Sequence, residues 1–152
     1  MSELLIKPAL FLASTSPRRR ELLKQIGLSF EVLRVDVDES TQGNESPEAY
    51  VQRLSLAKAQ MGLTQCSNNN DLVLAADTTV VVDNHIIGKP ETLEQAIAIW
   101  QSLSGRCHQV LTGVTLANHS YSKTIVVTTD VYFCLLSMQE MFFHWQGDRK
   151  GP

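Results

Sequence analysis

The stretch ALFLASTSPRRRELLKQIG, residues 9–27, predicts a β-strand, a short polar turn and an α-helix over 17–26. Its first five residues are apolar, as expected of a buried strand. Ser16 is a typical helix N-cap, and Pro17 suits the first helical position, where its missing N–H is not needed. Aliphatic residues then recur at helical spacing until Gly27 ends the segment. A strand that leads directly into a helix is typical of α/β proteins.

The first turn of this helix carries Arg18, Arg19 and Arg20, at the positive end of the helix dipole. Each arginine costs roughly 0.3–1 kcal/mol there unless an anion is bound. Free backbone N–H groups and the hydroxyls of Ser14 and Ser16 could complete a phosphate site. The alternative is a cluster whose side chains point into water, and the stretch alone favours neither. The turn matches neither the P-loop nor the Rossmann glycine pattern.

The rest of the chain alternates strands, helices and hairpins. The pattern predicts strands over 30–37, 72–82, 85–88, 108–117 and 122–136, a tight turn at Asp83–Asn84, and helices over 47–63 and 92–105. This order combines crossover units with hairpins. It therefore predicts an α/β fold with a mixed β-sheet flanked by helices.

Asp77 lies inside the apolar strand LVLAADTTVVV, residues 72–82. A carboxylate in such surroundings is costly unless it is paired or bound to a metal, so Asp77 is predicted to be functional. Asp36, Asp38 and Glu39 follow a strand, and by themselves they fit a solvated loop. A few carboxylates together with substrate phosphates are the usual ligands of Mg²⁺.

Lysines and histidines give weaker signals. Lys58 lies in the middle of a helix and is a surface residue by default, whereas Lys89 lies in the loop sequence IIGKPET. Either could reach a phosphate. The histidines show no metal-binding spacing and are interpreted as surface or hydrogen-bonded structural residues: His85, His108, His119 and His144.

Composition excludes several classes of protein. The 152 residues carry a net charge of −3, which argues against a general nucleic-acid binder. The three cysteines are far apart and odd in number, so a reducing, cytoplasmic setting is expected. Glu3 interrupts the opening segment, so no signal peptide is expected, and apolar runs are too short to span a membrane.

Six segments together carry a resemblance to a known family. They are LASTSPRRRELL, VDVDES, YVQRLSLAKA, LAADTTVVVDNHIIGKP, LSGRCHQVLTGV and TTDVYF, and they run in order between residues 9 and about 137. The chain resembles the Maf family of nucleoside triphosphate pyrophosphatases. The resemblance implies a Maf/inosine triphosphatase-like fold, release of pyrophosphate from a nucleoside triphosphate, and a divalent cation, Mg²⁺ or Mn²⁺. The resemblance leaves open whether the protein forms a homodimer.

The resemblance also assigns roles. It implies a triphosphate cradle of Ser14, Ser16, Arg18 and Arg19, phosphate contacts from Lys58 and Lys89, a metal held by Glu39 and Asp77, and Asp77 as the residue that activates water. Thr78 directly after Asp77 fits the branch of the family that acts on dTTP and UTP. The branch that prefers 7-methyl-GTP tends to carry glutamine at that position.

The last part of the chain departs from the family pattern. Cys134 replaces an arginine, and the pattern is lost after Ser137. The expected organisation is an incomplete Maf-like domain over 1–137, without the usual C-terminal strand region, and a divergent tail over 138–152. Two classes of function are therefore considered: an active dTTP/UTP pyrophosphatase and a catalytically impaired nucleotide-binding remnant. The residues retained on the phosphate side favour the enzyme.

Overall fold

The secondary structure follows the predicted order of strands and helices, with one further helix at the end. The computed structural model describes residues 9–150, without the side chains of 147–150. The elements are β1 (Leu10–Ala13), α1 (Pro17–Gln25), β2 (Glu31–Leu33), α2 (Pro47–Leu63), β3 (Leu72–Val82), β4 (His85–Ile87), α3 (Leu93–Leu103), β5 (Cys107–Ala117), β6 (Ser122–Tyr132) and α4 (Met138–Lys150).

The strands form one mixed sheet in the order β2-β1-β3-β5-β6, with β4 paired to β3. β1 is parallel to both β2 and β3, whereas β4 is antiparallel to β3. This confirms the predicted combination of crossover and hairpin connections. The chain divides into two compact units: one holds residues 9–77 and 112–126, the other 78–111 and 127–150.

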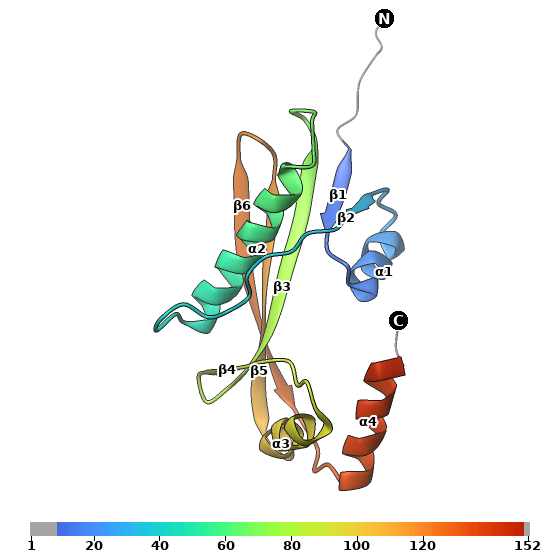
Figure 1. Cartoon of the computed structure of the whole chain (residues 1–152), viewed down its shortest axis with the longest axis vertical. Coiled ribbons are helices and arrows are strands. Elements are labelled where there is room, and N and C mark those ends of the chain that lie inside the picture. The colour runs from blue at the N-terminus through green and yellow to red at the C-terminus, as the bar shows by residue number, and fades with distance from the viewer. Residues whose placement is uncertain (1–8, 151–152) are drawn as a thin grey trace, which may run out of the picture. The chain divides into compact units, whose positions relative to one another are not determined.

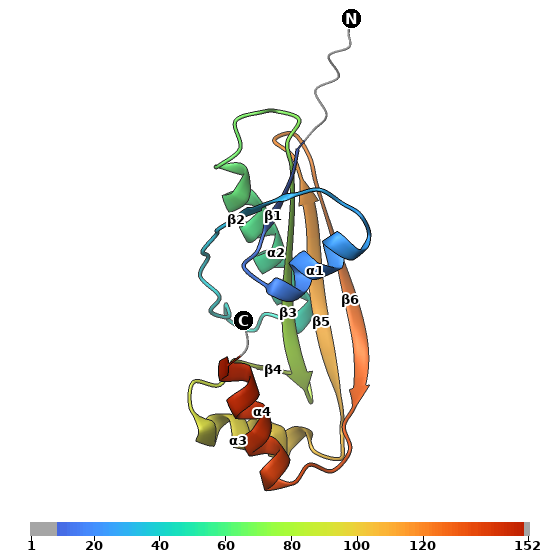
Figure 2. The ribbon, with the colours of Figure 1, turned by 90° about the vertical axis from the view of Figure 1, so that its right-hand side faces the viewer.

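In the first unit, α1 and α2 lie on opposite faces of the sheet (Figures 1 and 2). One buried cluster of the core consists of small side chains: Ala13, Ala59, Cys66, Val73, Ala75 and Ala117. Small residues let the helix approach closely. At Gly113 of β5, an added Cβ would lie 2.4 Å from the Val51 carbonyl oxygen on α2, so only glycine fits there.

A chain of buried hydroxyl groups links α2 to the hairpin of β5 and β6. The Thr115 hydroxyl donates to Ser55 Oγ at 3.0 Å, and Thr115 Oγ1 lies 2.7 Å from Thr124 Oγ1. Ser55 in turn donates to the carbonyl of Gln52 at 3.2 Å. Because every member has a partner, these polar groups can be buried without an unpaired donor.

In the second unit, a tight turn joins β3 to β4. Asp83 and Asn84 both have positive φ, 51° and 65°, as the primed hairpin turns require, which confirms the predicted turn. Arg106 donates to both carboxylate oxygens of Asp83, at 2.9 and 3.0 Å. Thr92 caps α3 by accepting the N–H of Gln95 at 3.1 Å.

His108 differs from the expected surface or hydrogen-bonded histidine. Its side chain is buried and packs edge-on against Phe133, with ring centroids 4.7 Å apart. Within the described part of the chain, its Nδ1 is buried without a hydrogen-bond partner. Desolvation lowers the pKa of His108, because burial disfavours the charged imidazolium.

Two of the predicted strands are shorter than expected, and one helix was not predicted. β2 covers only Glu31–Leu33 rather than 30–37, and β6 ends at Tyr132 rather than at 136. Residues 138–150 form α4, which begins with a capping box. In this box the Glu140 N–H donates to Ser137 Oγ and the Ser137 N–H to Glu140 Oε1, both at 3.1 Å. Over the residues described, no helix is long and apolar enough to cross a membrane.

Candidate active site

The turn between β1 and α1 is organised by the hydroxyls of two serines. Ser14 is buried, and its Oγ accepts the Ser16 N–H at 3.1 Å and the Arg19 Nη1–H at 3.3 Å. Ser16 caps α1 by accepting the Arg19 N–H at 3.4 Å, as predicted. The turn is thus held in one conformation, with the N-terminal end of α1 at its edge.

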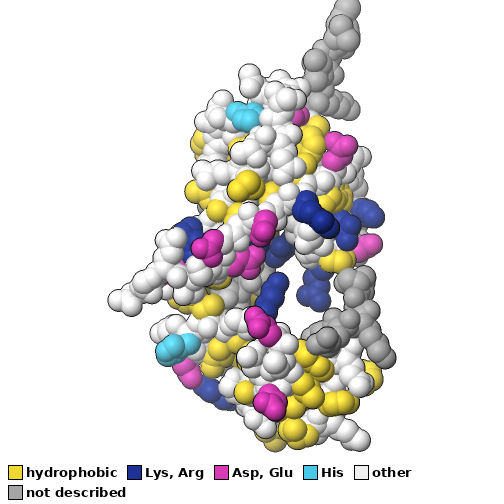
Figure 3. Space-filling model, in the orientation of Figure 1, with side chains coloured by type: hydrophobic (Ala, Val, Ile, Leu, Met, Phe, Trp, Pro, Cys, Tyr) yellow, Lys and Arg dark blue, Asp and Glu magenta, His cyan; other side chains and the backbone are white. Residues whose placement is uncertain are grey.

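The arginines of α1 differ in exposure. Arg18 is exposed, whereas Arg19 is half-buried and points back to Ser14. Burial lowers the pKa of the Arg19 guanidinium, and the negative charge of Asp77 partly offsets this. The first turn of α1 contains no acidic residue, so its positive end is not neutralised from within the helix. Basic side chains gather over this region in Figure 3.

Asp77 and Lys58 form a buried ion pair. Asp77 is 6% exposed, and its Oδ1 lies 2.8 Å from the ammonium Nζ of Lys58. The Lys58 side chain is 16% exposed, so the expectation of an ordinary surface lysine is wrong. Residues 50, 54 and 58 share one face of α2, and this face turns Lys58 toward β3. A carboxylate buried in this way requires a cationic partner.

Glu39 approaches the same ammonium from the segment between β2 and α2. Its Oε2 lies 3.5 Å from Lys58 Nζ, although the Glu39 side chain is 53% exposed. Two carboxylates from distant parts of the sequence therefore converge on one cation position. Carboxylate oxygens are the ligands that Mg²⁺ and Mn²⁺ prefer, so Glu39 and Asp77 fit a divalent cation.

The other acidic residues near Glu39 do not join this cluster. Asp36 is exposed, and Asp38 Oδ1 accepts the N–H and the hydroxyl of Ser40, at 3.0 and 2.8 Å. These hydrogen bonds lower the pKa of Asp38. Among the described residues, no group of three or more His, Cys, Asp or Glu side chains could hold a metal. A cation at Glu39 and Asp77 would thus take its other ligands from phosphates and water.

Two predicted site residues belong to the second unit. Thr78 follows Asp77 on β3, and Lys89 follows β4; both are exposed. Their assignment to the substrate stays a prediction. In contrast, Ser14, Ser16, Arg18, Arg19, Glu39, Lys58 and Asp77 all lie in the first unit.

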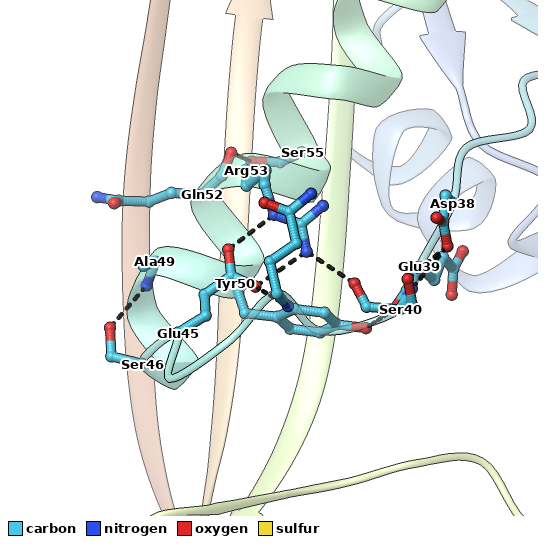
Figure 4. Close-up of polar contacts among 11 residues, drawn as sticks. Asp38, Glu39, Ser40, Glu45, Ser46, Ala49, Tyr50, Gln52, Arg53 and Ser55 are labelled. Atoms are coloured by element: carbon cyan, nitrogen blue, oxygen red, sulfur yellow. Dashed lines mark hydrogen bonds and ion pairs between the residues drawn. The ribbon is translucent and has the colours of Figure 1, made fainter.

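The sequence interpretation missed Tyr50 and Arg53 on α2. The sequence pattern predicts only the helix that carries them, over residues 47–63, and gives neither residue a role. Both contact the segment that carries Glu39 (Figure 4). Their spacing of three residues, which places them on one side of a helix, was the available signal.

These features define a class of site: a cationic helix N-terminus on an α/β sheet, together with two carboxylates that share one cation position. Such a site suits a phosphorylated ligand that brings a divalent cation. The family described as Maf-like protein matches residues 9–149. The chain belongs to the Maf family.

Curated relatives agree with this membership. A dTTP/UTP pyrophosphatase of Acinetobacter baylyi is 47% identical over 134 residues, which cover 88% of this chain and 72% of that protein. A dTTP/UTP pyrophosphatase of Shewanella oneidensis is 48% identical and covers 84% of this chain and 69% of its own length. Among solved structures, the Ham1 protein of Staphylococcus aureus has the same fold, with a TM-score of 0.58 over 82% of this chain and 71% of that one, at 14% identity.

Proposed function

We propose that this chain is a nucleoside triphosphate pyrophosphatase that converts dTTP and UTP to the monophosphate and pyrophosphate. The observation that carries the proposal is the buried Asp77, which shares the Lys58 ammonium with Glu39. The names of the curated relatives support dTTP and UTP as substrates, and Thr78 after Asp77 supports the same branch.

In the proposed reaction, the N-terminal end of α1 binds the phosphate chain. Ser16 and the backbone N–H groups of the first turn donate to phosphate oxygens, and Arg18 and Arg19 supply positive charge. The Arg19 guanidinium is already oriented by Ser14, so little conformational freedom is lost when it binds. Lys89 is assigned to the same phosphates.

Glu39 and Asp77 would hold a divalent cation, Mg²⁺ or Mn²⁺, which neutralises negative charge on the phosphoryl oxygens when bound. Lys58 occupies the shared position between the two carboxylates. Its flexible stem allows the ammonium to leave the carboxylates and bind phosphate oxygens instead.

Asp77 acts as the general base. It takes a proton from a water molecule, whose oxygen attacks the α-phosphorus. The bond between that phosphorus and the bridging oxygen to the β-phosphate breaks, and pyrophosphate leaves with the electron pair. The Asp77 carboxylate lies 2.8 Å from Lys58 Nζ, and its negative charge acts on the Arg19 guanidinium, so two cationic side chains surround the proposed base.

Asp77→Asn tests this assignment, because it preserves shape and removes the base. Pyrophosphate release from dTTP and UTP should fall at least ~10²-fold, while nucleotide binding persists. Asp71→Asn is the matched control: Asp71 is also buried, six positions earlier in the chain and roughly 20 Å away along the strand direction. It should keep normal turnover.

Pyrophosphate-release assays with several nucleoside triphosphates distinguish the proposed function from its alternatives. Faster hydrolysis of 7-methyl-GTP than of dTTP or UTP would assign the chain to the other branch. Nucleotide binding without pyrophosphate release from any triphosphate would favour the non-catalytic remnant. A cytoplasmic location belongs to the same proposal and is supported by Cys107 and Cys134, which are exposed free thiols.

A further inference from the structure

Glu39 reaches the site from a segment without regular structure. Residues 34–46, here called the acidic loop, form neither helix nor strand between β2 and α2. The Glu39 side chain is half-exposed, so packing around the carboxylate does not fix its place. Other contacts must hold the loop so that this carboxylate lies beside Lys58.

Arg53 of α2 holds the loop at two points. Its Nε and Nη2 donate to the two carboxylate oxygens of Glu45, at 2.7 and 2.9 Å. Nη2 also donates to the main-chain carbonyl of Ser40 at 2.9 Å. The bidentate pair orients the plane of the guanidinium, and the contact to Ser40 fixes the residue next to Glu39 (Figure 4).

Tyr50 holds the neighbouring peptide group. Its ring is buried, and its hydroxyl donates to the main-chain carbonyl of Glu39. The Arg53 guanidinium lies 5.6 Å from the centre of this ring, so the two side chains also support each other. In the irregular acidic loop, these donors satisfy two consecutive carbonyl groups, at positions 39 and 40.

Both donors come from the helix that carries Lys58. Tyr50 and Lys58 lie eight residues apart, two turns along one face of α2, and Arg53 lies between them. The helix α2 therefore sets the position of the Lys58 ammonium. It also sets the position of the peptide groups at residues 39 and 40, which carry the Glu39 carboxylate.

We propose that Tyr50 and Arg53 are positioning residues, which hold the backbone at Glu39 and Ser40 so that the Glu39 carboxylate faces Asp77 and completes the divalent-cation site. This rests on the proposed function. Neither residue is proposed as a ligand of the cation. Without them, Glu39 samples other positions, and ordering it reduces the free energy gained when the cation binds.

Tyr50→Phe tests the proposal, because it keeps the buried ring and removes only the donor. The probe is Mn²⁺, titrated by electron paramagnetic resonance in the presence of UTP with an imido group between its α- and β-phosphates, which resists cleavage. The dissociation constant of Mn²⁺ should rise about 3- to 10-fold, the effect of one lost hydrogen bond. With UTP and saturating Mn²⁺, kcat should stay near that of the parent.

Glu39→Gln and the double variant separate positioning from general damage. If Tyr50 acts through Glu39, Tyr50→Phe should weaken Mn²⁺ binding no further in the Glu39→Gln background. Ser46→Ala is the matched control: it removes the N-cap of α2, whose Oγ accepts the Ala49 N–H at 3.1 Å, and spares the carbonyls of residues 39 and 40. It should lower stability and leave Mn²⁺ affinity unchanged.

The outcomes are distinct. Unchanged Mn²⁺ affinity in Tyr50→Phe, an additive loss in the double variant, or an equal loss in Ser46→Ala would each overturn the positioning role while leaving the proposed function intact. If Glu39→Gln alone changes neither Mn²⁺ affinity nor pyrophosphate release, the cation site assigned under the proposed function is wrong, and the positioning role fails with it.

Discussion

Replacing Lys58 with methionine measures how far the protein depends on the ion pair with Asp77. Methionine keeps most of the apolar stem and removes the ammonium. The Asp77 carboxylate would then remain buried, at 6% exposure, without the group that lies 2.8 Å from it. Loss of one partner from a buried pair costs about 3–5 kcal/mol.

The expected loss lies at the lower end of that range. Lys58 is itself partly exposed, and the positive charge of Arg19 stays close enough to act on Asp77. We expect a loss of about 3 kcal/mol in the free energy of unfolding at pH 7. For a chain of this length, that corresponds to a Tm lower by about 6–12 °C. Urea and thermal unfolding, without nucleotide or divalent cation, measure both quantities.

A second substitution tests the cause of the loss. Asp77→Asn in the Lys58→Met background removes the unpaired charge, so it should recover about 2 kcal/mol. Lys58→Gln serves as a control that keeps a polar group in the same space. If Lys58→Met lowers the free energy of unfolding by less than about 1 kcal/mol, or if adding Asp77→Asn recovers none of the loss, the ion pair does not stabilise the fold as expected.

Three further predictions concern other parts of the chain. Arg18→Ala should weaken triphosphate binding in a calorimetric titration with little change in Tm, since Arg18 is exposed. Arg19→Ala should lower both the affinity for the triphosphate and the Tm, because Arg19 also donates to Ser14. Equal behaviour of the two variants would contradict this. In the folded protein, the pKa of His108 lies below its ordinary value of 6.5. As the pH falls below 6.5, the unfolded chain therefore binds a proton at His108 more readily than the folded protein does, and the free energy of unfolding decreases. His108→Leu should flatten this acid slope in urea unfolding curves, and an unchanged slope would assign it to other groups. Gly113→Ala should destabilise by about 3 kcal/mol, since its Cβ would overlap the Val51 carbonyl; a loss below about 1 kcal/mol in the same assay would show that α2 moves freely.

The local signals in the sequence predicted most of the fold. Ser16, Ser46 and Thr92 cap the three predicted helices, because capping depends on residues three positions apart. The carboxylate of Asp77 was predicted to need a partner, and it has one. The same local signal was present for α4, whose Ser137 and Glu140 form a capping box, although only a divergent tail is predicted there from the sequence.

The contacts that build the site were harder to predict, because they join residues far apart in the chain. Lys58 follows the helical pattern of a surface position, and only the packing of α2 on the sheet turns it toward Asp77. Arg53 reaches Ser40, thirteen positions earlier in the chain, and Ser40 lies on an irregular segment whose path no periodicity describes. Propensity and spacing describe each element but not which faces of different elements meet.

The glycine at position 113 has a consequence for which substitutions affect the site. Because a Cβ at Gly113 would overlap the carbonyl of Val51, this glycine allows α2 to lie close to the sheet, and α2 carries both Lys58 and the arginine that holds the acidic loop. A substitution at Gly113 would therefore change the position of Lys58, which lies seven residues after Val51 on α2. A mutational library aimed only at charged residues would never sample the position that sets their spacing.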